Sequence, residues 1–161
     1  MEERPAKKVS ESAINDNIYI IQPNDLNYLE TVFGGTVMAE ADKIAAAVAR
    51  RHSCQTCVTL SVDKFQFLSP AKVGEILVFK AAVNRVWNTS MEVGVKVFAQ
   101  NPQKEEYRHV VSAYFTFVPI ENGRPINAKY SVAPETEAEK RRWRQADERR
   151  TRRLQERSKN N

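Results

Sequence analysis

The chain has 161 residues, of which 42% are hydrophobic and 28% are charged, and its formal net charge is +5. This length suits one domain with its own core, the apolar content excludes a wholly disordered chain, and no apolar run approaches the roughly 18 residues of a membrane span. The positive charge is concentrated at one end. Residues 134–161 carry 10 Lys/Arg against 6 Asp/Glu, whereas residues 1–133 carry 15 against 14. We therefore expect neither a nucleic-acid nor a membrane partner for the body of the chain.

The N-terminal segment, residues 1–13, is expected to form a mobile tail. Its first ten residues are charged and lack the apolar core of a secretory signal. A short β-prone run follows at residues 18–21 and ends at Pro23, where Pro-Asn-Asp predicts a loop.

A helix is predicted from about Gly34 to Arg51. It is rich in Ala, the best helix former, and it carries apolar residues at helical spacing at positions 37, 41, 44 and 48. The Gly34-Gly35 pair at its start permits backbone conformations that a Cβ would forbid. Asp42 lies in the middle of this largely apolar helix, where a carboxylate is costly if it is buried and unpaired.

Four strands are predicted after the helix, at about residues 58–67, 75–87, 91–97 and 111–117. In the first of them the alternation of apolar residues changes parity, which predicts a bulge near Asp63-Lys64. Short turns join the strands, so neighbouring strands should be antiparallel. The prediction is an α+β domain over residues 14–133, in which an antiparallel sheet of about five strands covers one long helix.

Residues 134–161 have acids early and bases late, which favours a helix. We expect this charged helix to be solvated and docked partly by Trp143. Cys54 and Cys57 form a Cys-Gln-Thr-Cys motif, but no second pair completes a zinc site. We interpret Cys57 as an ordinary buried thiol within a strand, and we predict no metal site. Reduced thiols fit an intracellular protein.

Candidate chemistry gathers around the helix. Its unpaired N-terminal amides, reached through Gly34-Gly35, could form an oxyanion hole. Asp42 lies seven residues after Gly35, two turns and roughly 10 Å further along the same face, and could orient or deprotonate a water. Alternatively, it lies at the helix rim or pairs with Lys43 or Arg50.

Two polar side chains flank this helix in the sequence. Asn27 could donate a hydrogen bond to a carbonyl or hold a water. Alternatively, it is an ordinary turn residue, since Asn is common in turns. Thr59 could point its hydroxyl at the helix, or be an ordinary strand residue.

Together these residues form a family pattern. Asn27, Phe33-Gly34-Gly35, Asp42, Val58-Thr59 and the run from Phe65 to Pro70 resemble the hotdog-fold acyl-CoA thioesterases of the cytosolic acyl-CoA hydrolase type, as do Val73-Gly74-Glu75 and residues 89–93. The resemblance covers about residues 18–153. It implies a hotdog fold with an additional C-terminal helix, and a cytoplasmic enzyme that hydrolyses fatty acyl-CoA to free fatty acid and coenzyme A. No cofactor is implied, because coenzyme A is part of the substrate.

The resemblance also implies roles for residues. Asn27, Asp42 and Thr59 match the catalytic residues, with Asp42 as general base or nucleophile. Substrate would be bound by two segments, Phe33-Gly34-Gly35 and Thr89-Ser90-Met91. In the family, the Asn and Asp of one site come from two subunits, so a homodimer is the minimum and a hexameric trimer of dimers is common. Glu30 departs from the family pattern and could narrow the site, change acyl preference or face solvent.

Three alternatives stand beside this hypothesis. A non-catalytic acyl-CoA sensor could use the same fold, although the segment before Ile14 is too short for a helix-turn-helix. The basic tail could bind nucleic acid or an anionic membrane. A dehydratase of this fold would usually place a His beside the helix, whereas His52 lies at its far end. The sequence leaves the acyl chain length open.

Overall fold

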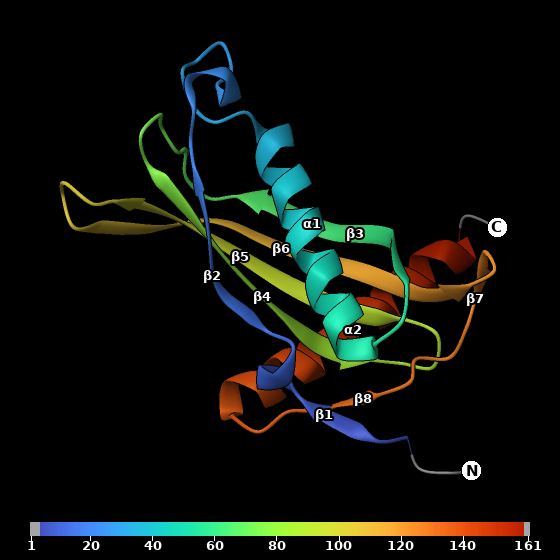
Figure 1. Ribbon diagram of the computed structural model, residues 1–161. Helices are drawn as coiled ribbons and strands as arrows, with labels where there is room; N and C mark the ends of the chain where they lie inside the picture. Colours follow the sequence, from blue (N-terminus) through green and yellow to red (C-terminus); the bar gives the residue numbers. More distant parts are fainter. Residues whose placement is uncertain (1–3, 160–161) are drawn as a thin grey trace.

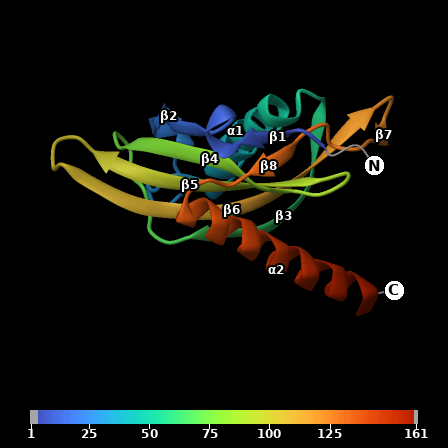
Figure 2. The ribbon, with the colours of Figure 1, turned by 90° about the horizontal axis from the view of Figure 1, so that it is seen from below.

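The computed structural model describes residues 4–159. A long helix, α1 (Gly34–Ser53), lies against a curled antiparallel sheet, and a second long helix, α2 (Glu137–Lys159), lies on the opposite face of that sheet (Figures 1 and 2). The remaining elements are two short 3-10 helices, η1 (Val9–Glu11) and η2 (Pro23–Asp25), and eight strands: β1 (Ala6–Lys8), β2 (Ile14–Ile20), β3 (Cys57–Phe67), β4 (Ile76–Val86), β5 (Met91–Asn101), β6 (Glu106–Glu121), β7 (Arg124–Pro125) and β8 (Ser131–Ala133).

Helix α1 buries the face that its sequence predicted. The side chains of Val37, Ala41 and Val48 are fully buried, and Ile44 is nearly so. The small Ala residues between them let the sheet approach closely, and Cys54 ends the helix in the left-handed conformation, its N–H bonded to the carbonyl oxygen of Arg50. The predicted amphipathic helix is therefore confirmed, two residues longer than expected.

The main sheet has the strand order β2-β4-β5-β6-β3, and every neighbouring pair is antiparallel. Strand β5 shows the predicted alternation, since Met91, Val93, Val95 and Val97 are all buried against the core. Strand β3 forms one edge of this sheet. Its register with β6 shifts twice, between Thr59 and Ser61 and between Val62 and Lys64, so the predicted bulge near Asp63 is confirmed and a second one precedes it.

The N-terminal segment differs from its prediction. Instead of a mobile tail, its described part, residues 4–13, contains strand β1, which pairs in parallel with β8. Val9 and Ser12 are buried. The Ser12 hydroxyl lies 3.1 Å from Nδ1 of His52, whose Nε2 lies 3.1 Å from the carbonyl oxygen of Ser131. A single buried imidazole thus ties the N-terminal segment, the end of α1 and β8 together.

Helix α2 is held by more than the predicted Trp143. Trp143 packs against the core, and the guanidinium of Arg85 lies 3.3 Å from the centre of its ring. In addition, Arg149 donates to the wholly buried Glu92 from Nε (3.0 Å) and Nη2 (2.7 Å), and Arg153 pairs with Asp63. Within residues 4–159, neither helix is long and apolar enough to cross a bilayer.

Candidate active site

Asp42 and Thr59 meet where α1 passes the edge strand β3. The Thr59 hydroxyl donates to Oδ1 of Asp42 over 2.7 Å. Asp42 is only half-buried and Thr59 is exposed, so the carboxylate keeps access to water and avoids the full cost of a buried charge. The predicted Lys43 partner instead bonds to Glu40 over 2.8 Å, and within residues 4–159 Asp42 has no ion pair, with Arg50 or any other residue. The structure therefore leaves this carboxylate free to act on a ligand.

The start of α1 supplies hydrogen-bond donors. Phe33 is the N-cap residue and offers no side-chain cap, and no acceptor within the described chain bonds the amides of Gly34 and Gly35. Unpaired amides at the positive end of a helix dipole attract a developing negative charge. This is the geometry that an oxyanion hole requires.

The two glycines are needed for space rather than for an unusual backbone. Neither has a positive φ. A Cβ on Gly35 would lie 2.5 Å from the Phe33 ring, and a Cβ on Gly34 would lie 3.1 Å from the Phe67 ring. The two glycines therefore make room for aromatic rings beside the helix start, so its surroundings are apolar.

Asn27 is held by its own loop. Its Oδ1 accepts from the backbone N–H groups of Leu29 (2.9 Å) and Thr31 (3.2 Å), and its Nδ2 donates to Oγ1 of Thr31 over 3.0 Å. Within residues 4–159, the second N–H of Nδ2 has no hydrogen-bond acceptor. Within the described protomer no hydrogen bond joins Asn27 to Asp42 or Thr59, so one copy of the chain does not assemble all three residues.

Around this loop, Glu30 adopts a positive φ of 61°. The side chain of Glu30 is exposed. Thr31, which bonds the Asn27 side chain, was not singled out from the sequence. The bond from the Leu29 amide to Asn27 is the turn that Asn commonly makes with the backbone two residues on.

The predicted substrate hairpin is only partly available to a ligand. Thr89 is exposed and Ser90 is half-buried, with its carbonyl oxygen bonded to the amide of Trp87. Met91, however, is fully buried beside Val86 and Phe117. Its side chain belongs to the core, because the alternation of β5 places this residue on the inner face. A role for this residue in substrate binding stays a prediction.

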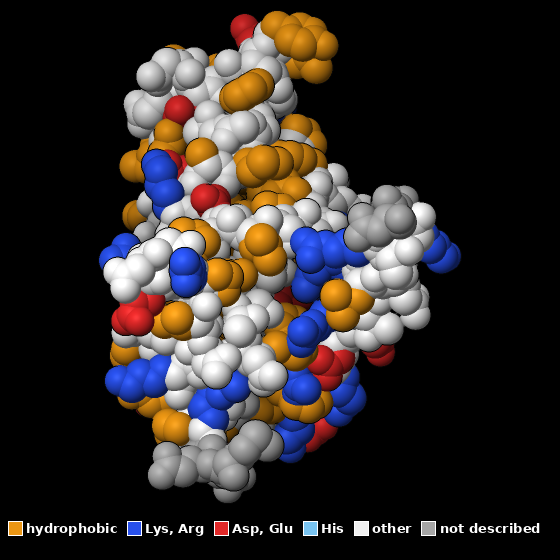
Figure 3. Space-filling view, turned by 90° about the vertical axis from the view of Figure 1, so that its right-hand side faces the viewer, with side chains coloured by type: hydrophobic (Ala, Val, Ile, Leu, Met, Phe, Trp, Pro, Cys, Tyr) orange, Lys and Arg blue, Asp and Glu red, His pale blue; other side chains and the backbone are white. Residues whose placement is uncertain are grey.

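Apolar side chains are exposed on β3 and at the start of α1, the two elements that carry the Asp42–Thr59 pair. Strand β3 presents Val58 (43% exposed), Leu60 (53%) and Val62 (39%), and Phe33 and Met38 are exposed at the start of α1. Figure 3 looks onto this side of the molecule, where hydrophobic side chains gather below the projecting loop. Within residues 4–159, β3 pairs with β6 alone. Sequence analysis missed this apolar edge, because nothing in the sequence gave the order of the strands.

Comparisons with known proteins agree with this geometry. Residues 29–106 match the family described as the thioesterase superfamily. Protein VdlD of Helicobacter pylori is 40% identical over 126 residues, which are 78% of this chain and 71% of that protein. An acyl-CoA hydrolase from Staphylococcus aureus, solved in complex with butyryl coenzyme A, coenzyme A and coenzyme A disulfide, matches with a TM-score of 0.89 at 35% identity, covering 97% of this chain and 94% of that one. The chain belongs to the thioesterase superfamily, in its group of acyl-CoA hydrolases.

A further member of this group, a hexameric acyl-CoA thioesterase solved in its apo form, matches with a TM-score of 0.90 at 34% identity, over 94% of this chain and 97% of that one. The hotdog fold expected from the sequence motifs is thereby confirmed, with the sheet curled around α1 and α2 added behind it. Membership of the family makes the protein an enzyme, a thioester hydrolase.

Proposed function

We propose that this enzyme hydrolyses fatty acyl-CoA to a free fatty acid and coenzyme A, with Asp42 as the residue that activates water or attacks the thioester. The observation that carries the proposal is the 2.7 Å hydrogen bond from Thr59 to Asp42, on an accessible carboxylate without an ion pair in the described chain. A carboxylate held in one orientation and unpaired amides at the start of the same helix are two of the parts that acyl transfer from a thioester needs.

The proposed reaction begins with the thioester carbonyl oxygen at the amides of Gly34 and Gly35. Asp42 takes a proton from a water whose oxygen attacks the carbonyl carbon, and the amides stabilise the oxyanion that forms. Collapse of this intermediate breaks the carbon–sulfur bond, and the proton on Asp42 passes to the departing thiolate. Each oxyanion-hole donor is worth about 3–4 kcal/mol in comparable sites. In the alternative route the Asp42 carboxylate attacks the carbonyl carbon and expels the coenzyme A thiolate, which takes a proton from solvent. Water then hydrolyses the resulting anhydride to the free fatty acid and the Asp42 carboxylate.

A second copy of the chain completes the site in this proposal. Asn27 is rigidly held with one N–H free, yet it lies outside hydrogen-bond contact with Asp42 in the protomer. An exposed apolar sheet edge such as β3 favours association with another chain. A second copy that binds along this edge would add its own Asn27 to the site. We propose a homodimer as the minimum and a trimer of dimers as the full assembly, supported by the hexameric relative.

The Staphylococcus aureus hydrolase supports these residue roles. Its structure has also been solved as three variants, in which an aspartate, an asparagine or a threonine is replaced by alanine. These three residues follow one another along that chain at the same intervals as Asn27, Asp42 and Thr59 do here. The asparagine variant was solved in complex with coenzyme A.

The proposal needs no metal or other cofactor, because the carboxylate and the helix amides supply the chemistry. Phe33, Thr89 and Ser90 remain candidates for substrate contacts, since all three reach the surface. A cytoplasmic location fits the two free cysteines, Cys54 and Cys57.

Free-thiol release from a panel of acyl-CoAs, from short to long chains, tests the function. We expect thiol release that is saturable and depends on chain length. Acyl-CoA binding measured in parallel separates the alternatives, because a non-catalytic sensor would bind acyl-CoA and release no thiol. That result would refute the proposal.

A further inference from the structure

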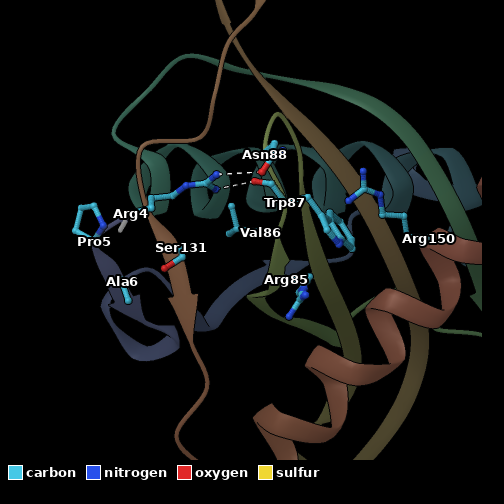
Figure 4. Close-up of a pocket in the computed structure, with 9 residues that line it drawn as sticks. All are labelled: Arg4, Pro5, Ala6, Arg85, Val86, Trp87, Asn88, Ser131 and Arg150. Atoms are coloured by element: carbon cyan, nitrogen blue, oxygen red, sulfur yellow. Dashed lines mark hydrogen bonds between the residues drawn. The ribbon is translucent and has the colours of Figure 1, made fainter. Parts of the chain in front are cut away.

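Strand β4 has different surroundings at its two ends. Its last residues and the turn that follows line an open pocket of about 740 Å³, beside the predicted substrate hairpin (Figure 4). Its start is held instead by close contacts between charged side chains. Glu75, the residue immediately before β4, is only 7% exposed, so its charge needs specific partners.

Glu75 accepts three hydrogen bonds, two of them from a single guanidinium. Arg108 donates from Nη1 to Oε1 over 2.9 Å and from Nη2 to Oε2 over 3.1 Å. The backbone N–H of Lys72 donates to Oε2 over 2.8 Å. Burial tends to raise the pKa of Glu75, but Arg108 and the Lys72 amide outweigh burial and lower the pKa below its usual value. The carboxylate is therefore charged at neutral pH, and its paired bonds to the guanidinium fix its orientation.

These contacts fix the segment that joins β3 to β4, residues 68–75, which we call the support loop. Arg108 also donates from Nη2 to the carbonyl oxygen of Pro70 over 3.0 Å. Arg108 belongs to β6, which β5 separates from β4 in the sheet, so its guanidinium reaches across one strand to bind the loop. Because residues 68–75 lie in neither a helix nor a strand, their conformation depends on contacts of this kind.

The support loop in turn contacts the segment that leads into α1. The backbone N–H of Val32 donates to the carbonyl oxygen of Ala71 over 2.8 Å, and Thr31 forms an isolated antiparallel bridge with Lys72. Both segments lie at the end of the molecule where α1 begins (Figure 1). The position of Thr31 is thus tied to the loop that Glu75 and Arg108 hold.

Thr31 connects this contact to Asn27. Nδ2 of Asn27 donates to Oγ1 of Thr31 over 3.0 Å, and Oδ1 accepts from the amides of Leu29 and Thr31. A displacement of the support loop at Lys72 would therefore move Thr31, and with it the Asn27 side chain. Displacing a group that takes part in a reaction by about 1 Å can lower the rate about 10²-fold.

We propose that Glu75 and Arg108 are positioning residues, which hold Asn27 in place through the support loop and Thr31. The inference rests on the proposed role of Asn27 in thioester hydrolysis. It adds to that role two residues of opposite charge that act on the asparagine through backbone contacts.

Residue-resolved amide hydrogen exchange of the full chain, measured by mass spectrometry, tests the positioning without reference to activity. Arg108→Lys keeps the charge but removes the forked pair of bonds. The amides of Leu29 and Thr31, which donate to Asn27, should then exchange about tenfold faster or more, whereas the buried helix amide of Val48 should exchange at its original rate. Equal acceleration at all three amides, or acceleration at Val48 alone, would indicate a general loss of stability and overturn the proposal.

Glu106→Gln is the matched control. The Glu106 carboxylate also pairs with Arg108, over 3.4 Å, but it is exposed and makes none of the contacts that fix the support loop. Exchange at Leu29 and Thr31 should not change in this variant, and rates equal to those of Arg108→Lys would overturn the proposal. Glu75→Gln weakens the pair from its other side and should reproduce the local acceleration if Arg108→Lys folds poorly.

Turnover with and without the asparagine separates positioning from a purely structural role. Arg108→Lys should lower kcat about tenfold in the otherwise unaltered protein and no further in Asn27→Ala, because the group that it positions is then gone. An equal fall in both backgrounds would overturn the proposal. If Asn27→Ala alone retains full kcat, the proposed role of Asn27 in hydrolysis fails, and exchange at Leu29 and Thr31 still decides whether Arg108 holds the turn.

Discussion

Replacing Asp42 by Asn isolates the charge of the proposed catalytic carboxylate. The amide has the same shape, and its oxygen can still accept the hydroxyl hydrogen bond that Thr59 donates over 2.7 Å. Asp42 is half-buried and has no ion pair in the described chain, so the loss of charge should change the free energy of unfolding by no more than about 1 kcal/mol. The variant should therefore fold and melt almost as the unaltered protein does.

Turnover should respond very differently. A positioned general base contributes about 10²–10⁴-fold, which corresponds to about 3–5 kcal/mol of activation free energy. Thiol release from a saturating acyl-CoA should fall by that factor in Asp42→Asn. Glu40→Gln is the control, because it removes a carboxylate from the same helix whose partner is the exposed Lys43. Retention of more than about a tenth of kcat by Asp42→Asn would refute the assignment.

Solvent oxygen distinguishes the two routes open to Asp42. In the general-base route, a single turnover in ¹⁸O-water places the label in the fatty acid. Label found in the Asp42 carboxylate after one turnover identifies the anhydride route. Mass spectrometry of the peptide that contains Asp42 makes this measurement.

Four further predictions follow from the contacts. Thr59→Val should lower kcat about tenfold and Thr59→Ser should restore it, whereas equal rates in the two variants would exclude an orienting role for the hydroxyl. Glu92→Leu should lower the free energy of unfolding by about 3 kcal/mol in urea titrations, because it leaves the largely covered Arg149 without its carboxylate, and adding Arg149→Met should recover much of that loss. Burial lowers the pKa of His52 in the folded protein, so on acidification the unfolded chain takes up this proton before the folded protein does. The melting temperature should therefore fall as the pH drops below about 6.5. His52→Asn should make the melting temperature less dependent on pH in this range. Leu60→Lys on the exposed edge should weaken self-association in sedimentation experiments and reduce activity together, and an unchanged oligomer would contradict our interpretation of this edge.

Local patterns were enough to predict the elements that form the centre of the fold. The apolar spacing of α1 and the alternation in β5 each follow from a single element packing on one face, so periodicity alone identifies the buried side chains. The parity change in β3 likewise revealed its bulge near Asp63. These signals require no knowledge of what the element packs against.

The features that were missed depend on distant parts of the chain. Strand β1 is three residues long, and its partner β8 lies more than a hundred residues later, so no periodicity could reveal the pair. The contact between Glu92 and Arg149 joins a strand to the C-terminal helix and appears in the sequence only as two charges among many. The burial of Met91 follows from the inner face of β5, which the turn motif that suggested its role does not describe.

The candidate site shows the same division. Residue spacing suggested that Asp42 and the helix amides share a face, but the family resemblance was needed to select Thr59 among the many Thr and Ser residues of the strands. Asn27 was predicted as a site residue, whereas its rigid loop, built around Thr31, was visible only in the structure. Physical reasoning from the sequence proposed the chemistry, and tertiary contacts decided which side chains could take part.

The position of Asp42 reconciles two opposing requirements. A base must stay ionised, which favours contact with water, yet it must also be held in one orientation, which favours packing. At the edge of the sheet the hydrogen bond from Thr59 supplies the orientation while the absence of a further strand keeps water within reach. Val58 and Leu60 adjoin Thr59 in the edge strand and are exposed, so we expect a second copy that covers this edge to lie beside the strand that orients the carboxylate. Assembly and completion of the active site would then be the same event, and a protomer kept apart from its partner should fold yet hydrolyse thioesters poorly.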